Sequence, residues 1–586
     1  MSLRVAGSIA TSALRTSEVG LAVASSNVAN ADTEGYTRKT SSTVTRDTGT
    51  GISSVDITSV SSNVDRYLLK TIVSAESDLG YAETRDSYLD QLQSSLGSVT
   101  ADDDSTGTDI GSMIDALADT LGTLATSPES GSAKAATVQD LSDLAETLRS
   151  TSSTVQSLRA QADDEIATTV DSINETLHSI DDLNEQIVKG KALGQNVTDL
   201  EDQRNTALKS LASDLDVTYQ VDDSGLMRIS TASGKSLLDS AVHELSYTPA
   251  SSVSADTTYS ASGSSGFNGI MLNGTDITGS SLGGSLGALV QLRDSDLPAQ
   301  QAALDELATS LIDTLNGIQN QGTSYPAPQT LTGTETVSAG DALKVTSGTL
   351  RVAVTDSSGT AAEVLDIDLS TMSTLQDVVD AINTMSNASA SISADGKLVI
   401  SADSSSNGIA LGGDANDGTT GAFSDAYGLN DLLTGTGASD IEVAARISAD
   451  SSLLATGVLS STSGLTAGDT ALTSGEGSIA SALSAAFSTS RSFDAAGGLS
   501  ARSTTFAGYA GAVIQGAATL AETAASALES QETYTSSLET TFSSRSGVNV
   551  DEETAAISTL QSAYEAAAAV MKTLQEMFDT ALDMVQ

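Results

Sequence analysis

The chain has 586 residues, enough for several domains and a large buried core. It contains no Cys and no Trp, which excludes a disulfide framework, a thiolate metal site and a thiol nucleophile. Its 76 acidic residues outnumber 26 basic ones and give a formal net charge of −50. Such a field repels nucleic acid and anionic membrane surfaces, so we expect neither as a partner.

The first segment, residues 1–30, has an interrupted helical pattern. Leu14, Leu21 and Val28 repeat every seven residues among small side chains, which predicts a helix that ends before Gly35. Polar residues break the segment throughout, so it lacks the apolar core of a cleaved signal peptide. No run of about 18 apolar residues follows elsewhere, and no membrane-spanning helix is predicted.

Helical patterns continue through the next part of the chain. A periodic run over 68–96 precedes the strongest internal helix, where apolar residues over 166–187 recur at steps of three and four. A turn with two glycines follows. Thr198 and Glu201 then have the spacing of a capping box at a new helix start. We expect 155–215 to form an antiparallel helical hairpin.

The hydrophobic period changes after this hairpin. Short apolar pairs among Ser, Gly, Asp and Asn over 217–282 predict strands and turns, and helix returns at 297–315. Residues 331–464 form a separate unit, in which apolar residues alternate over 350–354 and 365–369 and an Asp-Gly pair indicates a tight hairpin. We interpret this unit as a β-rich α+β domain inserted between helical segments.

The clearest pattern occupies the last thirty residues, where an apolar seam of helical period runs without a break. Asn549 is a favourable N-cap, and the acids at 551–553 lie where a helix dipole is positive. A helix with such a seam needs a partner helix, either from this chain's own core or from a neighbour. We favour the neighbour and predict an assembly interface at the two chain ends. Its residues are Leu14, Leu21, Val28, Ile557, Leu560, Tyr564, Met571, Leu574, Phe578 and Val585.

These patterns predict a multidomain α+β protein. It has coiled-coil-like terminal helices, a helical-bundle middle domain and an inserted β-rich domain. The expected limits are 1–35 with 550–586 for the terminal domain, 36–330 with 465–549 for the middle domain, and 331–464 for the insert.

Candidate chemistry is sparse. The run 283–287, Gly-Gly-Ser-Leu-Gly, matches the G-x-S-x-G nucleophile pattern, which needs a His and an acid nearby. Only His178 and His243 are available, and 49 glycines make chance matches common, so we favour a glycine-rich turn. A secreted serine hydrolase that uses Ser285 is the remote alternative. The acidic run 102–104 lacks the alternating ligands of a calcium loop, and no metal, cofactor or catalytic site is predicted.

Both chain ends resemble the bacterial flagellar axial proteins, the family of rod, hook and hook-associated proteins. Residues 26–38 are similar to the N-terminal signature N-I-A-N-x-x-T-P-G-Y, with Glu34 where Pro is common. Residues 546–553, followed by Gln-Ser-Ala-Tyr at 561–564, resemble the hook-associated branch, and three interior stretches agree (199–204, 283–298 and 441–450). The motif residues are Asn27, Asn30, Gly35, Tyr36, Gly547, Asn549, Asp551 and Glu552.

The resemblance implies a structural protein without enzymatic activity, which joins the flagellar hook to the filament. A hook or rod subunit of the same family is the nearer alternative. Export through the flagellar type III apparatus, without a cleaved signal peptide, would place it outside the cell. The implied partners are like subunits in a ring, the hook protein, a second junction protein on the filament side, and a cytoplasmic export chaperone at the C-terminal region. Because isolated helices are marginal in water, we expect the ends to order as they assemble.

Overall fold

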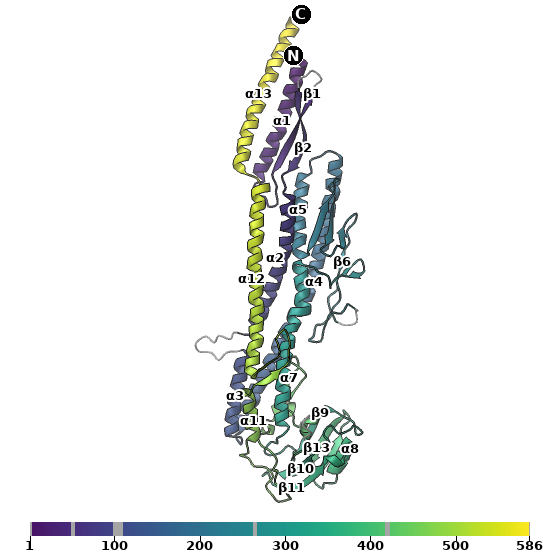
Figure 1. Cartoon of the computed structure of the whole chain (residues 1–586), viewed down its shortest axis with the longest axis vertical. Helices are drawn as coiled ribbons and strands as arrows, with labels where there is room; N and C mark the ends of the chain where they lie inside the picture. The colour runs from purple at the N-terminus through teal and green to yellow at the C-terminus, as the bar shows by residue number, and fades with distance from the viewer. Residues whose placement is uncertain (1–2, 48–52, 98–108, 262–265, 416–421, 585–586) are drawn as a thin grey trace.

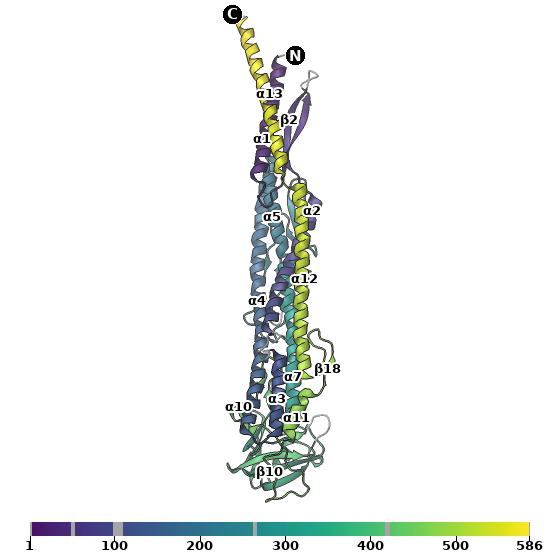
Figure 2. The same cartoon turned by 90° about the vertical axis from the view of Figure 1, so that its left-hand side faces the viewer.

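The computed structural model describes residues 3–47, 53–97, 109–261, 266–415 and 422–584. They form a long, narrow molecule in which most helices run along the long axis (Figures 1 and 2). Both termini lie at one end, and a β-rich unit lies at the other (Figure 1). This architecture confirms the predicted α+β multidomain class. No helix within these ranges has the length and apolarity that a membrane span requires.

The end that carries both termini consists of two helices and one hairpin. Helix α1 (Leu3–Ala29) packs along α13 (Val550–Asp583), and the antiparallel strands β1 (Lys39–Asp47) and β2 (Ser53–Ser62) run beside α1 (Figure 1). The sequence does not predict this hairpin, because its Ser- and Thr-rich strands lack a clear apolar alternation. The expected middle domain starts at residue 36 and so includes the hairpin, although the hairpin contacts α1.

Long helices build the body of the molecule. They are α2 (Arg66–Ser95), α4 (Gly131–Ala192), α5 (Thr198–Asp214) and α12 (Phe506–Ser546). Helices α4 and α5 pack on each other across a short turn, and α4 begins well before the predicted hairpin. Shorter elements continue the bundle toward the far end: α3 (Ile110–Thr126), α6 (Gly284–Gln291), the π-helical turn η1 (Leu292–Asp296), α7 (Leu297–Gln319), α11 (Ser478–Ser488), β17 (Arg491–Phe493) and β18 (Arg502–Thr504).

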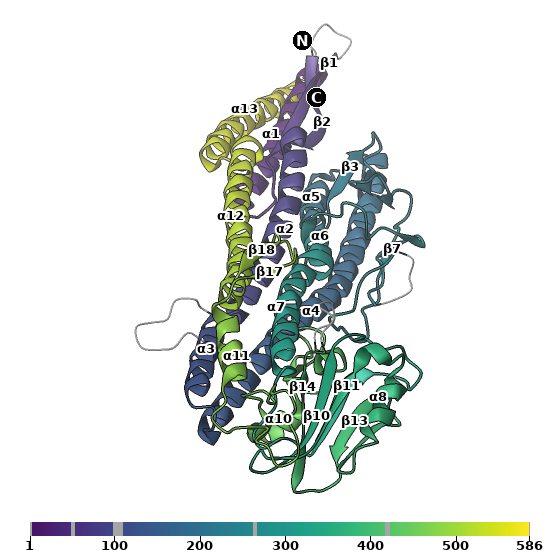
Figure 3. The same cartoon turned by 60° about the horizontal axis from the view of Figure 1, so that its bottom comes forward.

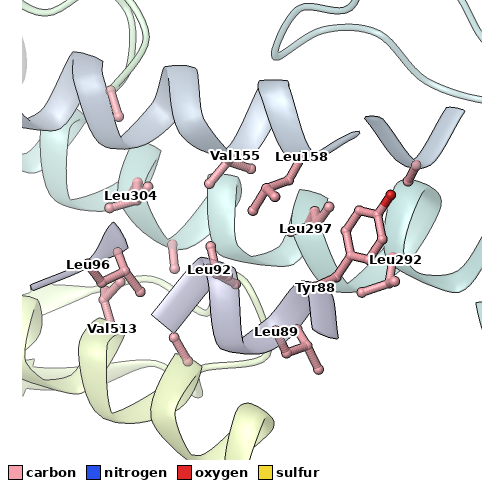
Figure 4. Packing of buried hydrophobic residues seen from close by; sticks show 14 of the residues in the cluster. Tyr88, Leu89, Leu92, Leu96, Val155, Leu158, Leu292, Leu297, Leu304 and Val513 are labelled. Atoms are coloured by element: carbon pink, nitrogen blue, oxygen red, sulfur yellow. The ribbon is translucent and has the colours of Figure 1, made fainter. Parts of the chain in front are cut away.

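One hydrophobic core joins these helices. Figure 4 shows Leu89 and Leu92 of α2, and Leu96 just after it, gathered with side chains from three other helices. Those partners are Val155 and Leu158 of α4, Leu297 and Leu304 of α7, and Val513 of α12. The body therefore has its own buried core, which does not depend on the terminal pair.

The start of α5 corrects one expectation: the predicted capping box is wrong. Thr198 is already the first helical residue, and its hydroxyl donates to Asn196 Oδ1 at 2.9 Å. Glu201 instead pairs with Lys191 at 2.7 Å, across the turn from α4. Asn196 supplies the acceptor that draws the hydroxyl away from the helix amides.

Two small antiparallel sheets cover one side of α4. They are β3 (Val217–Val221), β4 (Met227–Thr231) and β5 (Ser236–Leu238), then β6 (Leu245–Ser246), β7 (Met271–Leu272) and β8 (Thr275–Asp276). The polar residue in the buried stripe of α4, Asn184, donates to Met227 O at 2.9 Å and accepts from Met227 N at 3.0 Å. This pairing satisfies a buried amide and fixes the first sheet on the helix.

A buried arginine holds the second sheet region in place. Arg293, on the π-helical turn, is fully buried, and its Nη1 lies 3.0 Å from Asp163 Oδ1 on α4. The guanidinium also packs 4.6 Å from the centre of the Phe267 ring. The Arg-Asp motif at 293–294 therefore serves a structural ion pair between η1, α4 and the loop before β7.

The β-rich unit has a core of its own, built from two three-stranded antiparallel sheets and two α-helices (Figure 3). The sheets have the orders β11–β10–β14 and β12–β13–β9. The elements are β9 (Thr330–Thr336), β10 (Thr349–Asp356), β11 (Ala361–Asp368), η2 (Leu369–Thr371), α8 (Leu375–Ile382), β12 (Ala388–Ile392), β13 (Lys397–Ala402), β14 (Asn407–Gly413) and α9 (Phe423–Ala426). The expected Asp-Gly hairpin joins β12 to β13, with Gly396 at φ +73°.

The segment after this unit returns to the helical body. Apolar residues between 432 and 447 lie in the core of the body, although they fall within the expected limits of the insert. The elements of this segment are β15 (Leu433–Thr434), β16 (Glu442–Val443), α10 (Ala445–Ala449) and η3 (Ser451–Leu453). Residues 459–472 then form a small cluster with β10 and β14.

Candidate assembly interface

The α1–α13 pair is close-packed because α1 buries small side chains. The buried residues of α1 are Ala10, Ser17, Gly20, Ala24 and Asn27. A Cβ at Gly20 would lie 3.1 Å from both methyl carbons of Leu560, so the glycine permits the close approach of the two helices.

The structure brings most of the predicted interface residues to this pair but leaves some exposed. Seven are partly buried: Leu14, Leu21, Val28, Ile557, Leu560, Met571 and Leu574. Tyr564 and Phe578 remain exposed, and Val585 lies outside the described residues. The two ends of this chain therefore cover each other only in part.

A second apolar row on α13 was not predicted from the sequence. Val570, Met577 and Met584 repeat every seven residues beside the central seam and are 48%, 52% and 77% exposed. Their spacing is the signal that identifies them, because residues seven apart share one face of a helix. Large apolar side chains in such a row are unusual on a surface that stays in water.

A polar joint lies below the pair, and we define it as Asn27, Tyr36, Arg38, Lys39 and Glu553. Asn27 is fully buried and donates through Nδ2 to Lys39 O at 2.9 Å and to Glu553 Oε2 at 3.0 Å. Its Oδ1 accepts from Lys39 N at 3.0 Å and from the Tyr36 hydroxyl at 3.1 Å. Burial raises the pKa of Tyr36 above its ordinary value, which keeps the hydroxyl a donor. One amide thus ties α1, β1 and α13 together.

Arg38 links the joint to the helix ends around it. Its Nε lies 2.7 Å from Glu553 Oε1 and its Nη1 lies 3.1 Å from Glu552 Oε2. Asn549 caps α13 as predicted, since its side chain accepts from the amides of Asp551 and Glu552. These acids therefore hold the first turn of α13 against β1.

A second set of contacts fixes the joint on the body. Thr37 donates to Asp202 on α5 from both its amide, at 2.9 Å, and its hydroxyl, at 2.7 Å. The buried ammonium of Lys39 also pairs with Asp202. Gly35 has φ +75° and packs against Thr206, so this turn favours a glycine.

The remaining motif residues have local roles. Asn30 donates to Ser26 O at 2.9 Å at the end of α1. A Cβ at Gly547 would clash with Ser543 O, at the point where α12 ends. Both residues shape the turns that lead into the terminal pair.

Replacement of Gly20 by Leu is expected to destabilise the α1–α13 pair by about 1–3 kcal/mol, because the side chain is forced against Leu560. Gly7 is the matched control, since nothing lies within 4 Å of a Cβ built there. Gly7→Leu is expected to be neutral or to stabilise by up to about 1 kcal/mol. Thermal unfolding of the purified variants measures both changes, and equal losses would contradict the close packing.

The contacts of the candidate nucleophile, Ser285, indicate a structural role for this side chain. Ser285, in the first turn of α6, donates to Asp214 Oδ1 at 3.2 Å. The two histidines form hydrogen bonds with other acids: His178 with Glu244, and His243 with Asp239. The acidic run 102–104 lies outside the described residues, and the described residues hold no group of three or more potential metal ligands.

Ser285→Ala is expected to lower the free energy of unfolding by about 1 kcal/mol, the value of one hydrogen bond. Burial already raises the pKa of Asp214, and the variant removes a hydrogen bond that lowers it. Filament growth is expected to stay unchanged. A simultaneous loss of hydrolysis of an ester or peptide substrate would instead support the hydrolase alternative.

Comparison with known families agrees with this architecture. The helical-domain model of the flagellar hook-associated protein FlgK matches residues 89–333. The model of flagella basal body rod proteins matches 8–37, and the C-terminal model of the flagellar basal body rod FlgEFG proteins matches 539–584. Paired terminal helices on a helical body, with these matches, define a flagellar axial protein.

Individual relatives narrow the class. Flagellar hook-associated protein 1 of Salmonella typhimurium is 24% identical over 325 residues, which cover 53% of this chain and 56% of that protein. The Bacillus subtilis protein of the same name is 25% identical over 237 residues, 38% of this chain and 45% of its own length. These matches span about half the length of the curated relatives. The family models and these relatives thus indicate the hook-associated protein 1 family, to which the chain is similar over about half of its length.

A solved structure shows the same fold. The flagellar hook junction protein FlgK from Burkholderia pseudomallei matches with a TM-score of 0.50 and 17% sequence identity. The match covers 80% of this chain and 99% of that one. The elongated arrangement of helices and inserted strands is thus shared at low sequence identity.

Proposed function

We propose that this protein is a structural, non-enzymatic component that joins the flagellar hook to the filament. The observation that carries the proposal is the partly covered α1–α13 pair, whose exposed row lies at the tip of a long molecule. Full burial of one large apolar side chain contributes about 1.5–3 kcal/mol. Covering the row by like subunits would therefore stabilise the assembled state by several kcal/mol per subunit.

The proposal assigns each structural unit a place. The terminal unit lies innermost, the helical middle domain surrounds it, and the β-rich insert faces outward. Neighbouring copies in a ring, the hook protein and a second junction protein on the filament side are the proposed partners. Export through the flagellar type III apparatus, with a chaperone at the C-terminal region, delivers the chain to this position outside the cell.

Electron microscopy of isolated flagella, with gold-labelled antibody to the insert, tests this position. We expect label confined to the boundary between hook and filament. Label along the hook shaft or rod would favour the alternative of a hook or rod subunit. Flagella without any label, from cells that make the protein, would overturn the proposal.

A further inference from the structure

A pocket of about 610 Å³ lies beside the first two turns of α5, near the end of β2. Arg66 and Lys70 from the start of α2 and Arg204 from α5 line it. The acid in its lining, Glu201, is already paired with Lys191 at 2.7 Å. Three basic side chains around one pocket are notable in a chain with 26 basic and 76 acidic residues.

The basic groups of this pocket have unused hydrogen-bonding capacity. Arg204 is only 3% exposed, and its Nη1 donates to Asn184 and Gly225, yet its Nε lacks a hydrogen-bond partner among the described residues. Within the same ranges, Arg66 and Lys70 form no ion pair. Because the Arg204 side chain is buried, Arg66 and Lys70, which are both exposed, are the basic groups of the pocket that a carboxylate from outside can reach.

An exposed aromatic side chain stands beside these groups. Tyr67 also lines the pocket and is 89% exposed, although it is large enough to bury a considerable apolar area. Tyr and Arg are the residue types that dominate binding energy at protein interfaces. The pocket therefore has the composition of a docking site for an acidic protein segment.

The opposite face of α5 carries the complementary charge. Asp199, Gln203 and Thr206 border a notch with the loop 30–36, whose Asp32 and Glu34 are exposed. At 100° per residue these positions lie on the side of the helix opposite Glu201, Arg204 and Asn205, which border the basic pocket. Both features occupy the same two turns of a helix that runs along the long axis (Figure 1).

We infer that the acidic loop Asp32–Glu34 of one copy docks into the basic pocket of the next copy in the ring. Copies related by rotation about an axis parallel to the long axis present the two features at the same height, as a closed head-to-tail contact requires. Asp32 and Glu34 then supply the carboxylates that Arg66 and Lys70 lack, and Tyr67 packs at the rim. This inference rests on the proposed function as a ring-forming junction protein.

Charge reversal tests the contact. Arg66→Glu with Lys70→Glu, and separately Asp32→Lys with Glu34→Lys, are each expected to lower the fraction of cells with filaments by about tenfold or more. The four changes together are expected to restore it to within about twofold, because the charges are complementary again. Lys235→Glu, compared with Lys70→Glu alone, controls for a change of net charge. Circular dichroism confirms that each variant is folded.

Cysteine cross-linking gives an independent measurement, because the natural chain has no Cys. Cells produce two tagged forms of different size, Tyr67→Cys and Glu34→Cys, and isolated flagella are oxidised. We expect a mixed disulfide dimer, which must join two chains since each has one cysteine. Asp395→Cys in the distant insert replaces Tyr67→Cys as the control and is expected to give none.

Two results would overturn the inference. One is normal filament growth in both charge-reversed pairs, and the other is failure of the combined variant to recover together with absence of the mixed dimer. If these occur while the protein still labels the hook–filament boundary, only the pocket contact fails. Absence of label at that boundary would remove the proposed function itself.

Discussion

Cells that produce the chain without residues 557–586 are expected to form hooks but no filaments, and to be non-motile. The deletion removes all but the first turns of α13. It uncovers the small-residue face of α1 around Gly20 and eliminates the exposed row from Val570 to Met584. Both the contact within the chain and the surface offered to neighbours are lost, so no partial function is expected.

Spreading in soft agar and electron microscopy of the deletion strain measure this result. Immunoblots of the culture medium separate failure to assemble from failure of export, because the proposed chaperone contact lies in the same region. A strain that produces the full-length chain with Ser285→Ala is the control and is expected to swim normally. Filaments of normal length on the deletion strain would contradict the role of the terminal pair.

Asn27→Ala is expected to weaken the polar joint by about 2–4 kcal/mol. The change leaves the amide and carbonyl of Lys39 and one oxygen of Glu553 without their partner, in a buried environment. Each buried polar group that loses its hydrogen bond costs about 1–3 kcal/mol. The loss is local, so we expect separation of α13 from β1 rather than unfolding of the body, which has its own core.

Asn30→Ala is the matched control, since it removes an amide of the same motif that makes an exposed bond to Ser26 O. Asn30→Ala is expected to lower the stability of this region by about 0.5–1 kcal/mol. Hydrogen exchange in the first turns of α13 and in β1 measures both variants. Exchange is expected to accelerate by roughly 30-fold or more for Asn27→Ala, since each 1.4 kcal/mol is about tenfold. Equal acceleration in the two variants would show that the buried network is not what holds the helices.

Local sequence rules predicted those features whose cause lies within a few residues. The Asn549 cap and the turn at Gly396 follow from side chains next to the backbone groups that they serve. The predicted capping box at Thr198 was wrong because the side chain of Asn196, two residues away, offers a competing acceptor for the Thr198 hydroxyl. Hydrophobic period also located the terminal helices, since one continuous seam is visible without knowledge of its partner.

Local sequence rules could not predict features that are formed by segments far apart in the sequence. The bond from Asn27 to Glu553 joins residues 526 positions apart, and neither residue indicates the other in the sequence. The β1–β2 hairpin packs against α1, and its own strands have no clear apolar alternation that would predict it. The basic pocket requires α2, α5 and β3 to be brought together before its charge is apparent. Family resemblance marked Asn27 and Tyr36, but their hydrogen-bond partners are visible only in the folded structure.

The pairing of α1 with α13 has a consequence for the order in which parts of the molecule fold. Thr11 approaches Met571 across 560 positions of chain, so this closure has one of the largest entropy costs in the fold and follows formation of the body. During synthesis, α1 and the helical body precede the opposing helix, α13. On the proposed function, α1 alone cannot offer the exposed row to neighbouring copies, because that row lies on the opposing helix.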